Sequence, residues 1–113
     1  WLLRRILNNL VVNAIRHSGA TAAIDIVAFY EDEQVKILVR DTGRGIPLEE
    51  QALLFFKHSR SALRAGQSRD DTGLGLVFCK MASEVLGGTI EVASTPGAGT
   101  TFSVRVPATQ TRV

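Results

Sequence analysis

The sequence is poor in several features that define whole classes of protein. Its 113 residues include one cysteine, three prolines, one tryptophan and one tyrosine. A single cysteine excludes a disulfide framework, which needs pairs. No apolar run approaches the ~20 residues of a membrane-spanning helix, and the start Trp1-Leu2-Leu3-Arg4-Arg5 lacks a signal-peptide layout. We therefore expect a reduced, cytoplasmic domain with no direct membrane contact, although a longer parent protein could carry a membrane anchor.

An excess of one charge sign is also lacking. Thirteen Lys plus Arg against eleven Asp plus Glu leave a formal net charge of +2, which is too small to indicate nucleic-acid binding by itself. Hydrophobic residues make up 45% of the chain and charged residues 21%, as in globular domains. A chain of this length buries roughly 65% of the surface that its unfolded form exposes. We expect one domain over residues 1–113, with a core that needs no structural metal.

Apolar spacing predicts two long helices. Residues 2–17 carry apolar side chains three and four apart, and Gly19 follows as a stop signal. Residues 74–86 form the second pattern, ended by Gly87-Gly88. Its expected core contacts are Leu76, Val77, Met81 and Val85, with Cys79 as a small core residue. Because the first helical pattern begins at residue 1 without a cap, we expect a fragment of a longer protein, truncated at its N-terminus.

Between and after these helices, the sequence predicts two hairpins. Residues 24–30 and 35–40 read as strands around a polar turn, and residues 90–93 and 100–106 as strands around a Pro-Gly turn. A short helix over 48–57 and a long basic loop over 58–72 lie between the hairpins. The order of elements predicts an α+β two-layer sandwich, with a mixed, mostly antiparallel sheet and helices on one face.

Three polar residues share one face of the first helix. Asn9, Asn13 and Arg16 follow one another at spacings of four and three. An amide oxygen can ligate Mg²⁺ beside phosphates without the repulsion of a carboxylate. Taken alone, three such residues are equally typical of a solvated helix face.

Two glycine-containing segments add to this pattern. Asp41-Thr42-Gly43-Arg44-Gly45-Ile46 follows a predicted strand, where a carboxylate can accept from an amine such as that of adenine. Gly73-Leu74-Gly75-Leu76 opens a predicted helix, whose N–H groups can bind phosphate. Each segment alone could be an ordinary turn or hinge. Neither fits the dinucleotide or P-loop fingerprint, so any nucleotide site here is of another kind.

In chain order, these segments and Gly99-Thr100-Thr101-Phe102 resemble the N box and the glycine boxes of one superfamily. It is the superfamily of gyrase, Hsp90, histidine kinases and MutL (GHKL), and the match is to its histidine-kinase branch. The resemblance extends from Leu3 to Val106. It implies the Bergerat ATP-binding fold and the catalytic, ATP-binding domain of a two-component sensor histidine kinase, with ATP and Mg²⁺ as cofactors.

The resemblance also implies roles for individual residues. Asn13 would ligate Mg²⁺, Asn9 and Arg16 would support the metal and the phosphates, and Asp41 would accept from the adenine amine. Thr101 would make a water-mediated contact. The remaining expected contacts with the nucleotide are His17, Gly43, Gly45, Ile46, Lys57, Arg60, Thr72, Gly73, Leu74, Gly75 and Leu76. One departure is His58, which stands where the family usually has the second phenylalanine of the box that begins here at Phe55.

The residues distinguish several possible functions. ATP-hydrolysing relatives carry a glutamate as general base where this chain has Asn9, and an amide cannot take that proton. Transfer to a supplied acceptor is therefore favoured. The resemblance implies that this acceptor is a histidine on a separate phosphoacceptor domain, with a response-regulator receiver domain downstream, so we expect no self-labelling by this fragment. The alternative is a domain that binds ATP as a sensor or scaffold without passing on its phosphate. Two Asp-Thr-Gly triplets, at 41–43 and 71–73, weakly suggest an aspartic protease, but the second lies in polar loop sequence.

Overall fold

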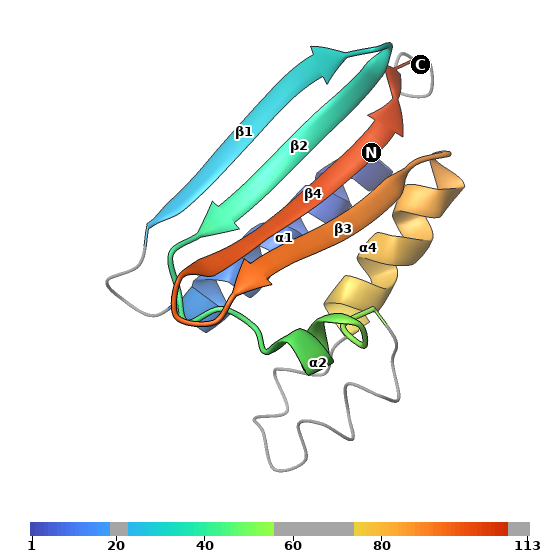
Figure 1. The fold of residues 1–113 in the computed structure, drawn as a ribbon. Helices are drawn as coiled ribbons and strands as arrows, with labels where there is room; N and C mark the ends of the chain where they lie inside the picture. Colours follow the sequence, from blue (N-terminus) through green and yellow to red (C-terminus); the bar gives the residue numbers. More distant parts are fainter. Residues whose placement is uncertain (19–22, 56–73, 109–113) are drawn as a thin grey trace.

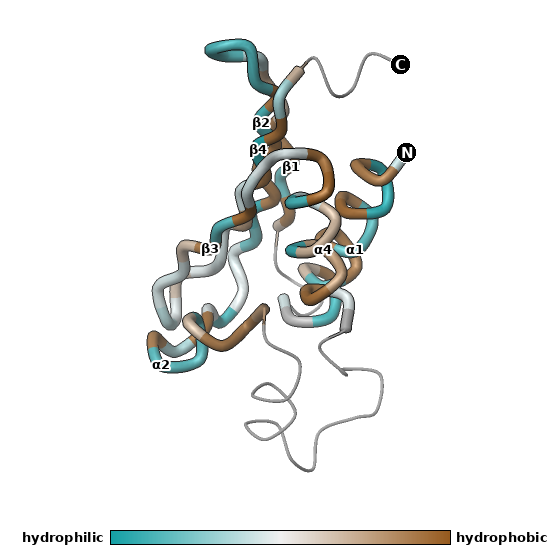
Figure 2. The backbone as a smooth tube through the Cα atoms, turned by 90° about the vertical axis from the view of Figure 1, so that its right-hand side faces the viewer, coloured by the Kyte–Doolittle hydropathy of each residue, from teal (hydrophilic) through white to brown (hydrophobic). Residues whose placement is uncertain are grey.

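The computed structural model describes residues 1–18, 23–55 and 74–108, and forms two layers. The helices are α1 (Leu2–Ser18), α2 (Leu48–Gln51) and α4 (Leu74–Val85). The strands are β1 (Ile24–Glu31), β2 (Gln34–Asp41), β3 (Thr89–Thr95) and β4 (Gly99–Pro107). They form a four-stranded sheet in the order β1-β2-β4-β3, and every pairing among the described strands is antiparallel. Figure 1 shows α1 and α4 behind the sheet, and the edge-on view in Figure 2 places both on the same side.

Turn chemistry explains why the strands return where they do. Asp32 and Glu33 adopt positive φ angles of 55° and 61° in the tight turn between β1 and β2, as a type I′ turn requires. At the end of α4, the Gly87 N–H donates to the Glu84 carbonyl and the Gly88 N–H to the Ser83 carbonyl. These two bonds form a Schellman cap, with Gly87 at φ 80°. The predicted hairpins and the predicted end of the second helix are confirmed.

The core lies between the helices and the central strands. Along β4, Phe102, Val104 and Val106 point toward the helices and are at most 2% exposed. They pack against one stripe of α1, whose buried residues are Ile6, Leu10 and Ala14. The alternation in β4 and the stripe in α1 are those expected from the sequence. The repeat of two residues in a strand and of 3.6 residues in a helix each place apolar side chains on one face.

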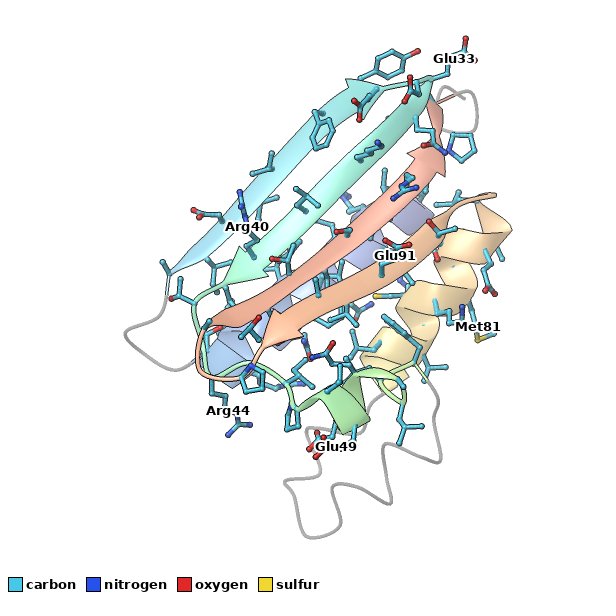
Figure 3. All side chains as sticks on the ribbon, in the orientation of Figure 1. Glu33, Arg40, Arg44, Glu49, Met81 and Glu91 are labelled. Atoms are coloured by element: carbon cyan, nitrogen blue, oxygen red, sulfur yellow. The ribbon has the colours of Figure 1, made fainter. Side chains whose placement is uncertain are left out.

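On α4 the sequence prediction of the buried face is partly wrong. Leu76 is buried as expected, but Met81 and Val85 are 62% and 73% exposed, and Figure 3 shows Met81 pointing away from the sheet. The stripe that faces the core consists of Leu76, Cys79, Ala82 and Ser83. This helix is apolar on both sides, and the small residues occupy the inner one because they allow close packing against α1 and the sheet. The predicted helix over 48–57 is also shorter, since α2 ends at Gln51 and gives way to turns.

Cys79 is fully buried, and its thiol donates to the Ile6 carbonyl oxygen at 3.6 Å. Burial raises the pKa of the thiol to about 12, so the reactive thiolate is scarce in the folded chain. We expect iodoacetamide at pH 8 to alkylate the native protein at least about 100-fold more slowly than the urea-unfolded protein, because reaction requires opening of the core. Equal alkylation rates in the two states, measured by mass spectrometry, would contradict this packing.

None of the helices in the described residues is both long and apolar enough to cross a membrane.

Candidate nucleotide-binding site

Several of the segments singled out in the sequence meet at one end of the fold. Strand β2 ends at Asp41, and residues 42–47 lead from it to α2. The C-terminal end of α1, the N-terminal end of α4 and the turn between β3 and β4 lie at the same end in Figure 1. The antiparallel order of the sheet produces this arrangement, because it brings the end of β2 beside the start of β4.

Asp41 is half-buried at the last position of β2. Its Oδ1 atom accepts a hydrogen bond of 2.8 Å from the backbone N–H of Gly43. An ionised carboxylate is an acceptor at both oxygens, so Oδ2 keeps the capacity to accept from a ligand amine. In the sheet register Asp41 lies opposite Thr100, and Thr100 lies opposite Ser94. These three residues form one row across the helix-facing side of the sheet.

Gly45 in the 42–47 loop has a definite packing role. Gly45 has a φ of 79°, and a Cβ at this position would lie 2.3 Å from the backbone oxygen of Thr95. The Gly97 N–H donates to the Arg44 carbonyl oxygen at 2.6 Å. The loop therefore lies directly on the turn between β3 and β4, at a distance that only glycine permits. Arg44 itself points outward from this contact in Figure 3.

On the helical side, Asn9 meets the N-terminal turn of α4. Its Nδ2 donates to the Arg5 carbonyl oxygen at 3.0 Å, and a Cβ on Gly75 would lie 3.2 Å from its Oδ1. Asn9 and Asn13 are both half-buried, so this face of α1 is not the fully solvated one that the sequence also allowed. Arg16 is exposed one turn farther along, and His17 lies in the last turn of α1.

Thr101 does not lie in the same row of the sheet as Asp41, although both residues line the hollow at this end of the molecule. Thr101 lies opposite Arg40 and Ala93 in the register, on the sheet face that carries no described helix. Thr100 is the threonine on the Asp41 side, 6% exposed and hydrogen-bonded to Ser94. The alternation of Phe102, Val104 and Val106 along β4 is the signal that could have identified Thr100, because alternate residues share a face.

The remaining residues expected to contact the nucleotide lie in different parts of the structure. Ile46 packs against the core, and Leu76 is only 3% exposed within it, so Leu76 can shape the site by packing rather than by polar contact. Phe55, the first phenylalanine of its box, packs edge-on against Phe102 with ring centroids 6.3 Å apart. Lys57, Arg60, Thr72 and Gly73 lie outside the described residues, as do Gly19, the loop 58–72 and the side chains of His17 and Leu74.

A hollow of about 540 Å³ lies at this end of the molecule, where β2 ends beside the start of β4. Its lining includes the row of Asp41, Thr100 and Ser94. Asp25 and Arg40 also line it, and Figure 3 shows Arg40 on the face away from the helices. The hollow therefore borders both the row that contains Asp41 and residues of the open face.

The described residues contain no group of three or more His, Cys, Asp or Glu side chains that could hold a metal. An amide oxygen fits Mg²⁺, which retains water and is commonly held by one or two protein oxygens together with ligand phosphates. Asn13 offers one such oxygen, on the same helix as Asn9 and four residues farther on.

Comparison with known proteins identifies the family of the chain. The family described as histidine kinase-, DNA gyrase B-, and HSP90-like ATPase matches residues 2–110. The alginate biosynthesis sensor protein KinB of Pseudomonas aeruginosa is 35% identical over 93% of this chain and 17% of its own length. The circadian input-output histidine kinase CikA of Synechococcus elongatus is 38% identical over 93% of this chain and 14% of its own length. The chain thus spans less than a fifth of these curated relatives.

Solved structures give the same result. Full-length ShkA in complex with AMPPNP superposes with a TM-score of 0.78 at 29% identity, over 94% of this chain and 21% of that one. The nucleotide-free catalytic domain of the histidine kinase ThkA also gives 0.78, at 28% identity over 95% of this chain and 66% of that one. With the match over residues 2–110 and the two-layer fold, the chain belongs to the family of histidine kinase-, DNA gyrase B- and HSP90-like ATPases, in its histidine-kinase branch.

Proposed function

We propose that this domain binds Mg-ATP at the candidate site and donates the γ-phosphoryl group to a histidine on a separate phosphoacceptor domain. That domain would belong to the same protein or to its dimer mate, in the cytoplasm. A response-regulator receiver domain would accept the phosphoryl group next. The likeness to a kinase solved with AMPPNP supports ATP as the nucleotide.

The approach of Asn9 to Gly75 is the observation that carries the proposal. It sets the N-terminal end of a 12-residue helix against the asparagine-bearing face of α1. The first N–H groups of such a helix have no partner within the helix and carry partial positive charge, which favours phosphate. Because Gly75 has no side chain, a phosphate could approach these groups closely. Asp41, at the end of β2, would hold the base.

Each residue has a limited task in this scheme. Asp41 accepts from the exocyclic amine of adenine, and Asn13 contributes an amide oxygen to the cation. Arg16 adds positive charge near the phosphates, where it offsets the charge of the group in transfer. When bound, Mg²⁺ neutralises phosphate charge and fixes the phosphate geometry. The chain therefore acts mainly by positioning and charge neutralisation.

The amide at position 9 favours transfer over hydrolysis. Its Nδ2 already donates to the Arg5 carbonyl, and an amide has no basic site that could take a proton from water at neutral pH. We expect the acceptor imidazole to come from a partner domain.

Calorimetric titration with ATP, ADP and GTP, with and without Mg²⁺, tests the proposal. We expect adenine nucleotides to bind and GTP not to bind at the same concentrations. Failure of ATP to bind would overturn it. If ATP binds but γ-labelled phosphate never reaches an added phosphoacceptor domain from a relative, the sensor alternative replaces the kinase.

Replacing Asp41 by asparagine is expected to weaken ATP binding about 10-fold and to narrow the preference for ATP over GTP. The weaker ATP binding corresponds to the loss of one charge-assisted hydrogen bond. The preference for ATP narrows because the amide of the variant can turn its NH₂ group toward the base. Glu91→Gln is the control, since Glu91 is an exposed carboxylate on the open face of the sheet and does not line the hollow beside Asp41. The same titrations measure both variants, and an unchanged ATP-to-GTP ratio in Asp41→Asn would refute the assignment of Asp41.

A further inference from the structure

Ser94 is a half-buried residue of β3 with an unusually complete set of hydrogen bonds. Its Oγ accepts from the Ile46 N–H at 2.8 Å and donates to the Gly99 carbonyl oxygen at 2.9 Å. The Thr100 Oγ1 lies 2.8 Å from the same atom. A serine hydroxyl has one proton and two lone pairs. The Gly99 carbonyl can only accept, so both contacts are hydrogen bonds when Ser94 donates to Gly99 and the Thr100 hydroxyl donates to Ser94.

This hydroxyl also fixes the loop that carries the candidate base site. Ile46 is held at both of its backbone polar groups, since its carbonyl oxygen accepts from Gln51 Nε2 at 2.8 Å. Gln51 Nε2 also lies within 3.0 Å of the Ser94 carbonyl oxygen. With the bond from Gly97 to Arg44, the loop is attached to the β3–β4 hairpin at several points.

We propose that Ser94 is a positioning residue for base recognition, an inference that rests on the proposed function. It acts in two ways, through the backbone of Ile46 and through the proton of Thr100. With that proton directed at Ser94, the Thr100 hydroxyl has only lone pairs left for other partners. Asp41, next to Thr100 in the same row, is likewise an acceptor. The row therefore favours a base that supplies hydrogens, as the adenine amine does, over the carbonyl oxygen that guanine has at that place.

Removal of the Ser94 hydroxyl has two expected consequences. Ile46 loses its acceptor, so its amide proton should exchange with solvent faster. The Thr100 hydroxyl becomes free to rotate and donate, so the site should tolerate a carbonyl oxygen. A serine that only stabilises the hairpin predicts the first consequence without the second, because general loosening weakens ATP and GTP binding alike.

The test compares three variants of the 113-residue chain by nucleotide titration and by NMR exchange of the Ile46 amide. For Ser94→Ala we expect about 10-fold weaker ATP binding, from the loss of these hydrogen bonds, a smaller ATP-to-GTP ratio, and faster Ile46 exchange. Ser94→Thr restores a hydroxyl and should restore the ratio. Ser103→Ala is the matched control, because Ser103 is a half-buried serine of β4 on the open face. Its ATP affinity, its ATP-to-GTP ratio and its Ile46 exchange rate should equal those of the wild type.

The outcomes separate this proposal from the one on which it rests. If the wild-type chain binds ATP but Ser94→Ala keeps the wild-type ATP-to-GTP ratio, the role of Ser94 is refuted and the function stands. If the wild-type chain binds no nucleotide, the function fails, and the role of Ser94 fails with it. Should Ser94→Ala not fold, Ser94→Cys retains a weakly bonding group of similar size and carries the same expectations at smaller amplitude.

Discussion

Alanine in place of Gly45 is expected to destabilise the fold by about 3 kcal/mol or more and to lower its melting temperature by roughly 10–15 °C. Two costs combine. Gly45 has a φ of 79°, which alanine rarely adopts, and the added Cβ would lie 2.3 Å from the Thr95 oxygen and 2.8 Å from the Pro96 Cα. All three of its nearest neighbours are backbone atoms, so no side chain can rotate away. The 42–47 loop would have to leave the β3–β4 turn.

Gly97→Ala separates the two costs. Gly97 has a nearly equal φ of 85°, but a Cβ there would meet nothing within 4 Å. Only the backbone conformation opposes this change, so we expect a loss of about 1 kcal/mol. Urea or thermal unfolding of both variants measures the difference. Equal destabilisation would mean that the close approach of the loop to the turn does not exist in solution.

Loss of the Asn13 amide should give the largest effect on binding. For Asn13→Ala we expect ATP affinity in the presence of Mg²⁺ to fall by roughly 100-fold, or about 2.7 kcal/mol. An octahedral cation that loses its protein oxygen no longer links the phosphates to the helix. Without Mg²⁺ the variant and the wild type should bind ATP alike, since the contacts with the base do not involve Asn13. Calorimetry in the two conditions measures both quantities.

The control for Asn13 lies on the same helix. Asn8 is exposed, so Asn8→Ala removes an identical amide and imposes the same change in helix propensity without touching the candidate site. Its Mg-ATP affinity should equal that of the wild type. An Asn13→Ala variant with full Mg-dependent affinity would show that the cation is held elsewhere.

Local patterns in the sequence predicted most of the backbone. The stripe that includes Ile6 and Leu10 on α1, the hairpins and the glycine cap of α4 are confirmed, because each depends on residues close together in the chain. The face of α4 was predicted less well. Met81 and Val85 are as apolar as the residues that do face the core, and only packing against α1 and the sheet selects the side with the smaller ones.

In the candidate site too, some residues could be identified from the sequence and others only from the structure. Asp41, Asn9, Asn13 and the glycines could be identified from the sequence because they form short motifs with chemical meaning. Ser94 carries no such signal. A single serine in a strand is ordinary, and its contact with Ile46 joins residues 48 positions apart. Which of Thr100 and Thr101 shares the row of Asp41 likewise depends on which face of β4 meets the helices.

The sequence by itself therefore determined the order of helices and strands, the family and the residues that offer amide, carboxylate and glycine chemistry, because period, turn preference and motif are properties of neighbouring residues. Only the tertiary structure decided that Asn9 meets Gly75, that Gly45 rests on Thr95, and that Asp41, Thr100 and Ser94 share one row. These contacts arise from strand register and helix packing, which pair residues distant in the chain and depend on how the whole core fills its space.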